Sequence, residues 1–307
     1  MPTTHSKNTI ERLGLRDGGV LADEFDRLNI SLRVDTFASN DRKTEALMRR
    51  VEFADKPGIV YVATHKHSEE LAADLRQMGV GALCYHGGMK ARDRDEIESK
   101  FISGEVPVIV ATDTFDLGIE KPDIRFVYHA DVSESLDEYY REIGLAGRDQ
   151  KPAEAVLFYR SQDISAQQFK TGAAHVDEES LELAFNAITH RRKPLTREKI
   201  SEETGLSARK LVGILQKLEE AGAIRITPDG RFHARTKEPF GRVLEEAEQR
   251  RQFQMELRRQ HLKEMQAYAE SRSCRRECML CLLGGDYRGP CGNCDRCEQA
   301  GVLTKAA

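Results

Sequence analysis

Six of the seven cysteines in this sequence lie between residues 274 and 297, and three of them form the C-x2-C-x2-C run in "GPCGNCDRC". Thiolates at this spacing, joined by a fourth from upstream, can surround one tetrahedral zinc ion. The predicted ligands are Cys274, Cys291, Cys294 and Cys297. Cys278 and Cys281 lie a turn apart on an expected helix, and we expect both to face the core. An iron–sulfur cluster or buried free thiols are the alternatives to zinc.

A second stretch, "REIGLAGRDQ" at 141–150, holds an arginine of the kind that reaches toward a nucleotide phosphate. Such chemistry also requires a loop that holds the phosphates. No G-x-x-x-x-G-K-[ST] loop occurs in the 307 residues, and no DEAH-like acidic motif for magnesium occurs either. The sequence therefore offers one side of a nucleotide site.

The segments that must position these residues alternate between strands and helices. Short apolar runs rich in β-branched residues predict buried strands. They lie at 58–63, 106–112, 124–131 and 153–160, and 81–88 is expected to form a further strand with its loop. Helices are expected at 67–79 and 91–104. This alternation predicts a parallel sheet covered on both faces. We therefore expect the chemistry at the carboxyl ends of the strands, in the loops after Ala63, Tyr85, Thr112 and Asp131.

Composition narrows the class of protein. A length of 307 residues suggests about two domains. Net charge is −4 and the pI is about 6.2, which argues against a protein that coats nucleic acid by bulk charge but leaves room for a local basic patch. The sequence has no long apolar run and no apolar segment near its start, so we expect a cytoplasmic protein.

Residues 175–238 follow a different rhythm. Three short amphipathic helices precede an alternating segment around Asp229-Gly230, a strong hairpin signal, and together they predict a winged helix-turn-helix. Arg209 and Lys210 lie at the start of the candidate recognition helix, where two cations suit contact with DNA. Docking of another protein is the alternative. Arg275-Arg276 could extend a basic track, or could belong to an ordinary solvated face.

The motifs together resemble a known family. "GIVYVATHKHSEELAADL", "YHGGMKARDRDEIESKF", "VIVATDTFDLGIEKPDIRFVYHAD" and "EYYREIGLAGRD" follow one another like motifs IV to VI of the second RecA-like motor domain of RecQ-type DNA helicases. "CRRECMLCLLGG" and "GPCGNCDRC" resemble the zinc module of that family. The resemblance implies four segments. These are the tail of a first motor domain with its linker (1–45), the second RecA-like domain (46–165), the winged helix (175–238), and a long helix with the zinc module (240–300).

The resemblance also implies roles for single residues. Arg148 matches the last arginine of motif VI, which is similar to an arginine finger on the γ-phosphoryl group. Thr64, His86 and Thr112 follow three strands where a hydroxyl, an imidazole or a backbone N–H can hold a DNA phosphate. Glu120 lies where related helicases contact the ribose of ATP. ATP and Mg²⁺ are expected only together with the first motor domain.

Departures from the family pattern are equally specific. Arg141 stands where glutamine is usual, Leu145 replaces the first arginine of motif VI, and Asp116 replaces a small glycine. Leu145 is expected to remove a charge that would face the cleft between the motor domains. The winged helix precedes the zinc cysteines instead of following them. With no phosphate loop present, we expect a fragment, a truncated gene product or one half of a split enzyme.

The function predicted from these features is the C-terminal part of an ATP-dependent 3′–5′ DNA helicase of repair or recombination. It would bind single-stranded or duplex DNA and would not act as an ATPase alone. The alternative is a non-catalytic DNA-binding or regulatory protein derived from a helicase. A zinc-dependent transcription factor built on the winged helix is a third reading, which the run of helicase motifs disfavours.

Overall fold

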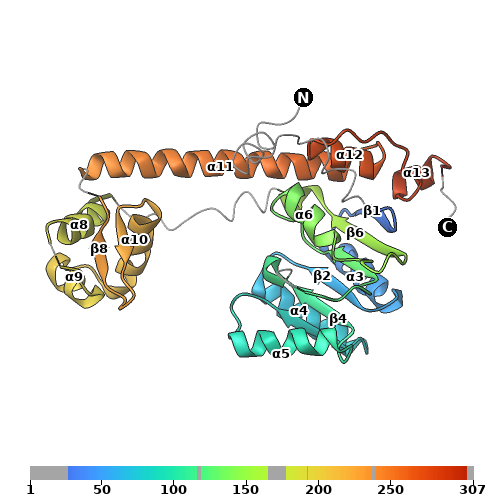
Figure 1. The fold of residues 1–307 in the computed structure, drawn as a ribbon, viewed down its shortest axis with the longest axis horizontal. Coiled ribbons are helices and arrows are strands. Elements are labelled where there is room, and N and C mark those ends of the chain that lie inside the picture. Colours follow the sequence, from blue (N-terminus) through green and yellow to red (C-terminus); the bar gives the residue numbers. More distant parts are fainter. Residues whose placement is uncertain (1–26, 116–118, 165–177, 192, 237–238, 303–307) are drawn as a thin grey trace. The chain divides into compact units, whose positions relative to one another are not determined.

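A computed structural model describes residues 27–115, 119–164, 178–191, 193–236 and 239–302 (Figure 1). The chain divides into two compact units. The first comprises Met1–Gln168 and Gln260–Ala307, and the second comprises Phe169–Arg259. Asp116 and residues 1–26, which carried sequence-based expectations, lie outside the described residues.

The first unit is built on a six-stranded sheet in which every pairing is parallel. The strand order is β1-β6-β5-β2-β4-β3. The strands are β1 (Ile30–Thr36), β2 (Gly58–Tyr61), β3 (Ala82–Tyr85), β4 (Val108–Ala111), β5 (Phe126–His129) and β6 (Ala153–Tyr159). All residues of β2, β4 and β5 are buried, as expected for central strands with helices on both faces.

Neighbouring residues along each strand serve opposite faces of the sheet. On β2, Ile59 and Tyr61 join one apolar cluster while Val60 joins the other. Helices α3 (Asn40–Phe53) and α4 (His65–Gln77) pack on the Val60 face. Helices α5 (Ala91–Ile102) and α6 (Leu136–Ile143) pack on the Ile59 face, together with the C-terminal part of α11 (Phe240–Glu270). A single 3₁₀ turn, η1 (Asp113–Phe115), follows β4.

The segment expected to precede this domain contributes to its sheet. β1 pairs with β6 along its full length, from Ile30 opposite Ala153 to Thr36 opposite Tyr159. Its alternate residues are buried, which favours this register because a slip by one residue would expose them. The expected boundary at residue 45 falls inside α3, so the structure places residues 30–45 within the sheet domain.

Helix α3 is tied to the sheet by a buried cation. Ser39 caps the helix by accepting a hydrogen bond from the Arg42 N–H. One turn later, the Lys43 ammonium donates to the Ala130 carbonyl at 2.6 Å and to the Asp163 carboxylate at 2.8 Å. Burial alone would raise the pKa of Asp131, but the hydrogen bond and charge of His67 and the charge of Lys43 bring it well below the usual range.

The second unit has the arrangement of a winged helix. Helices α8 (Glu178–Thr189), α9 (Arg197–Thr204) and α10 (Ala208–Glu220) are followed by the antiparallel strands β7 (Ile224–Ile226) and β8 (Phe232–Ala234). Leu195 pairs with Phe232 as an isolated bridge beside the hairpin. Gly230 adopts a φ of 75° in the turn, which a glycine tolerates without strain. No helix among the described residues is long and apolar enough to cross a membrane.

If Lys43 ties α3 to the sheet, Lys43→Met leaves Asp163 and Asp131 without their buried partner. We expect a loss of about 3–5 kcal/mol in the free energy of unfolding of the first unit. All eight tyrosines lie in that unit and the chain has no tryptophan, so tyrosine fluorescence in urea reports on it selectively. Arg49→Met is the control, because Arg49 lies on the exposed side of α3, and it should change stability by under about 0.5 kcal/mol. Equal effects of the two variants would contradict this assignment.

Candidate functional site

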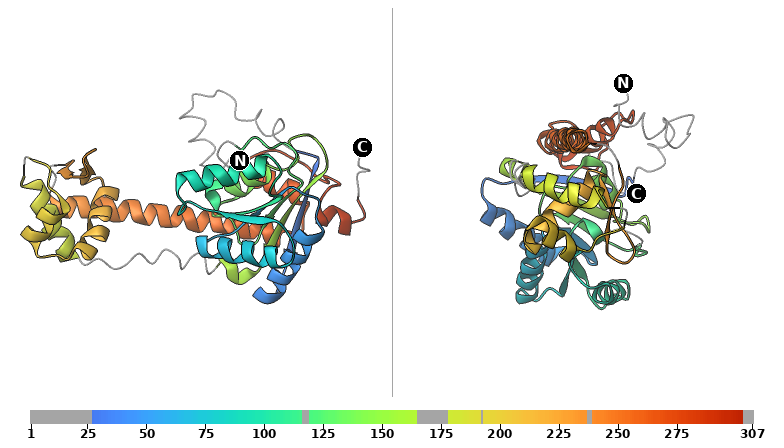
Figure 2. Two further views of the ribbon diagram at one scale, coloured as in Figure 1. Left: turned by 90° about the horizontal axis from the view of Figure 1, so that it is seen from below. Right: turned by 90° about the vertical axis from the view of Figure 1, so that its left-hand side faces the viewer.

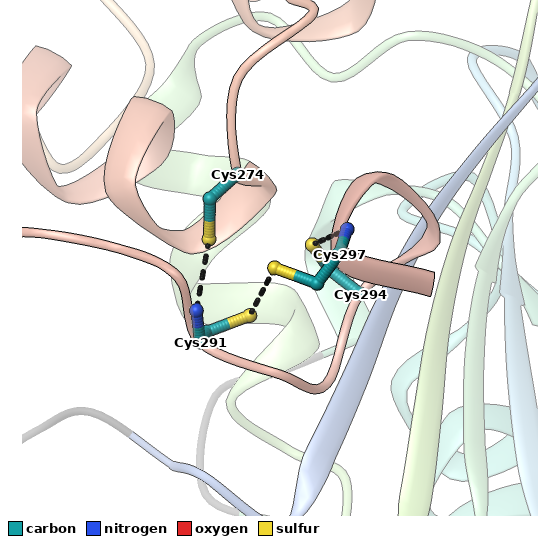
Figure 3. A group of neighbouring side chains, drawn as sticks. All are labelled: Cys274, Cys291, Cys294 and Cys297. Atoms are coloured by element: carbon teal, nitrogen blue, oxygen red, sulfur yellow. Dashed lines mark hydrogen bonds between the residues drawn. The ribbon is translucent and has the colours of Figure 1, made fainter. Parts of the chain in front are cut away.

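The four predicted cysteine ligands converge on one point. Their Sγ atoms all lie within 4.8 Å of one another, and all four residues are largely buried (Figure 3). The cage is formed by Cys274, Cys291, Cys294 and Cys297. Two of them cap helices, at α12 (Arg275–Leu282) and α13 (Asp295–Gln299), so the helix ends aim their sulfurs at the centre.

Backbone N–H groups surround these sulfurs. The Cys291 N–H donates to Cys274 Sγ, and the Cys297 N–H donates to Cys294 Sγ, both at 3.4 Å. Hydrogen bonding from the Cys291 thiol, helped by the N–H groups of Cys297 and Arg275, lowers the pKa of Cys294 to about 4. Hydrogen bonding to Cys294 and burial raise the pKa of Cys291, and burial raises that of Cys297. Cys294 is therefore the ligand that most readily becomes the thiolate that binds metal. Four convergent sulfurs without oxygen donors suit zinc in a closed, structural site.

The two remaining cysteines of the cluster stay outside the cage. Cys278 is half-buried against the core, as expected. Cys281 is exposed, which contradicts the expectation that it faces the core. Cys281 lies in the last turn of α12, where its thiol donates to the Tyr287 carbonyl at 3.4 Å instead of packing in the core.

Two buried arginines attach the cage to the rest of the first unit. Arg275 forms a two-pronged ion pair with Asp295 at 2.9 and 3.0 Å and donates to the carbonyl of Tyr268. Arg276 donates to the carbonyls of Arg27 and Ile30 at 2.6 and 3.0 Å. Each is about 1% exposed, so this pair is structural and does not extend a basic track on the surface.

The three candidate DNA-contact residues lie together at the carboxyl ends of the parallel strands, which we call the carboxyl edge of the sheet. They follow the adjacent strands β2, β4 and β3. Thr64 caps α4 by accepting from the His67 N–H at 3.1 Å. Thr112 is 5% exposed, and its hydroxyl lies 3.3 Å from that of Thr114. His86 is 6% exposed, bonds Glu69 at 3.1 Å and stacks on His65. Of the three positions, Thr64 is the most open to a phosphate.

Arg148 lies at the amino ends of the strands, which form the opposite edge of the same sheet. Its loop precedes β6, and its guanidinium donates to the Ile119 carbonyl at 2.9 Å. Glu120, the neighbour of Ile119, is exposed beside it. Gly147 bonds Ile124 and Asp149 bonds Pro122, just before β5. Arg148 therefore lies at the amino ends of the strands, away from the loops at the carboxyl ends where we expected the chemistry.

Leu145 is 2% exposed and belongs to the apolar cluster on the Ile59 face of the sheet. That this leucine removes a charge from a cleft between motor domains stays a prediction. Arg141 is exposed, and its guanidinium lies 3.7 Å from the Glu138 carboxylate. Burial, with the charges of Glu142, Glu134 and Asp113, raises the pKa of Glu138 to about 7.

Sequence reasoning missed Arg27 and Asn29, which lie just before β1. Arg27 donates to the Ala146 carbonyl at 3.0 Å, and Asn29 donates to the carbonyls of Gly147 and Lys151 at 2.8 Å. The only signal was their polar character beside a strand, in "DRLNI". Their partners are more than a hundred residues away, so no local pattern could reveal them.

In the second unit, Arg209 and Lys210 occupy the exposed first turn of α10. Ser207 caps this helix by accepting from the Lys210 N–H at 3.3 Å. The arrangement presents two cations and a helix N-terminus to solvent, which is a suitable surface for phosphate.

Comparison with known proteins gives two matches to family models. Residues 42–150 match the "Helicase conserved C-terminal domain", and residues 237–298 match "RecQ zinc-binding". The cysteine cage lies in the second match, which identifies its metal as structural zinc.

Curated relatives include a putative ATP-dependent DNA helicase Q1 from Caenorhabditis briggsae, 38% identical over 60% of this chain and 31% of that protein. The ATP-dependent DNA helicase RecQ of Pasteurella multocida is 39% identical over 52% of this chain and 25% of that protein. The chain thus spans less than a third of either relative. Among solved structures, the E. coli DEAD-box protein SrmB bound to RraA is 29% identical over 44% of this chain and 79% of that chain, with a TM-score of 0.40.

Cys294→Ser removes the ligand with the lowered pKa, so the cage loses its metal. Elemental analysis should find about one zinc per chain in the unaltered protein and a substoichiometric amount in the variant. Tyrosine fluorescence should show a large loss of stability, because a structural zinc site is worth on the order of 10 kcal/mol. Cys281→Ser is the matched control and should retain zinc. Full zinc in Cys294→Ser, or iron in the unaltered protein, would overturn the assignment.

Proposed function

This chain belongs to the RecQ-like helicases and matches their C-terminal portion, and on that premise we propose that it forms half of the motor of a 3′–5′ DNA helicase. The process would be DNA repair or recombination. ATP and Mg²⁺ would bind between this RecA-like unit and a phosphate-loop domain that its 307 residues do not encode. The observation that carries the proposal is the exposed Arg148, held by Ile119 at one edge of the sheet.

Arg148 would stabilise the negative charge that develops on the γ-phosphoryl group during transfer. An arginine in this role contributes roughly 10³–10⁵ to the rate. The hydrogen bond to Ile119 holds one terminal nitrogen of the guanidinium group and leaves its other N–H groups for phosphate oxygens. Glu120, one residue along, would contact the ribose.

DNA would bind at the other edge of the sheet. Thr64, His86 and Thr112 follow adjacent strands, so a phosphate backbone running across the edge would meet them in succession. Thr64 keeps its O–H donor free while its oxygen caps α4. His86 is buried and would require a side-chain movement to take part. Arg209 and Lys210 would supply a second contact on the winged helix.

Nucleotide would bind at the amino ends of the strands and DNA at their carboxyl ends. One rigid sheet would therefore hold both ligands. Closing the ATP cleft would shift the unit relative to its partner domain, and the DNA contacts would move with it. Hydrolysis would reverse the shift. In this way the Arg148 loop would convert cleavage of a phosphate bond into movement along a single strand.

A second candidate is a non-catalytic DNA-binding protein derived from a helicase. Leu145 favours it, because one of the two arginines of motif VI is replaced by a core residue. Its function would reside in the carboxyl edge of the sheet and in the winged helix alone.

The decisive experiment measures DNA-stimulated ATP hydrolysis by the chain alone and with a phosphate-loop domain of a RecQ helicase added in trans. We expect no turnover by the chain alone and turnover in the mixture. Arg148→Ala should lower the turnover of the mixture by roughly 10³-fold. Arg49→Ala, on the exposed side of α3, should leave it unchanged.

Turnover by the chain alone that is lost in Arg148→Ala would refute the half-site proposal. A mixture that hydrolyses no ATP, with salt-dependent binding of single-stranded DNA by the chain, would favour the second candidate.

A further inference from the structure

The loop that carries Arg148 is held by the segment just before β1. The Arg27 guanidinium donates to the Ala146 carbonyl and the Asn29 amide to the Gly147 carbonyl. Gly147 has a φ of 57°, and a Cβ there would lie 2.4 Å from the Asn29 amide nitrogen. The loop and the segment are therefore fitted closely, and Arg27 is kept beside Arg148.

Two guanidinium groups are thus placed together without a neutralising carboxylate. Within the described part of the chain, neither Arg27 nor Arg148 forms an ion pair, and each uses one terminal nitrogen on a carbonyl. Burial lowers the pKa of Arg27, and the charge of Arg148 lowers it further. By contrast, nearby Arg33 is paired with Glu298 at 2.6 Å. Like charges held together in this way create a site that favours an anion with several charges.

The position of Arg27 is set from the zinc module. Arg276, in the first turn of α12, donates to the Arg27 carbonyl at 2.6 Å. The Asn293 amide, between two cage cysteines, donates to the neighbouring Leu28 carbonyl at 2.8 Å. The zinc module thus holds the backbone of this segment, while the Arg27 side chain reaches the Ala146 carbonyl.

We propose that Arg27 is a second phosphate-binding cation beside Arg148, and that the pair binds the polyphosphate chain of a nucleoside triphosphate. The inference rests on the proposed function and names a residue of the same site. Leu145 replaces the first arginine of motif VI and lies in the core, so it supplies no positive charge. Arg27 would supply that charge instead. A DNA phosphate is the less suitable ligand, because the candidate DNA contacts lie at the opposite edge of the sheet.

The test is calorimetric titration of the full-length chain with inorganic tripolyphosphate at low salt. Arg27→Gln removes the charge and should weaken binding about tenfold, the range of a charge-assisted hydrogen bond. Arg27→Lys restores the charge and should recover most of the affinity. Arg148→Gln should weaken binding to a similar degree, and Arg33→Gln, from the paired neighbour, should not change it.

Absence of tripolyphosphate binding by the unaltered chain would overturn the proposal. So would an Arg27→Gln variant that binds as well as the unaltered chain, or an Arg27→Lys variant that is equally impaired, since a purely structural role makes the charge irrelevant. A thermal melt of each variant shows whether the unit is folded at the titration temperature. Because the titration involves no hydrolysis, the anion site stands if binding depends on both arginines while the mixture with a phosphate-loop domain remains inactive.

Discussion

Four thiolates within 4.8 Å of one another repel unless a cation lies between them, and the arrangement of the C-terminal module depends on that constraint. Zinc ties the start of α12 to the start of α13, and the sixteen residues between Cys274 and Cys291 include the whole of α12. With both helix ends fixed, Arg275 meets Asp295, and Arg276 meets the backbone before β1. Loss of the metal would leave two buried arginines without a defined set of partners, which is costly in a low-dielectric interior.

The segment from Arg27 to Leu32 transmits this constraint to the loop that carries Arg148. Leu32 donates its N–H to the Asn293 carbonyl and bridges Cys294, so the module extends the edge of the sheet at β1. On its other side the segment bonds the loop of Arg148. Residues 148 and 274 are far apart in the sequence, yet only this short segment separates the metal cage from the candidate arginine finger. A mutation or loss of metal in the cage should therefore alter the loop of Arg148, and a change in that loop should alter the cage.

The strands and the metal ligands could be predicted because their signals are local. Apolar β-branched runs mark β2, β4 and β5, and the C-x2-C-x2-C spacing marks three of the four ligands. The membership of β1, the burial of Leu145 and the amino-edge position of Arg148 could not be predicted in the same way. The membership of β1 depends on pairings between residues more than a hundred positions apart, such as Ile30 with Ala153. The positions of Leu145 and Arg148 depend on how their loop packs against other elements of the unit, such as Ile119. The polar pair Arg27 and Asn29 carries no motif of its own, and its meaning emerges only when the loop of Arg148 lies against it.

The central claim is that the zinc cage, the segment before β1 and the Arg148 loop form one cooperative body. Hydrogen–deuterium exchange of the intact chain, with and without a zinc chelator, tests it directly. Removal of zinc should release the amides of 27–32 and 144–151 together with those of 274–299, while α9 and α10 in the second unit keep their protection. If exchange rises only in 274–299 and the Arg148 loop stays protected, the cage is an independent module and the claim is wrong.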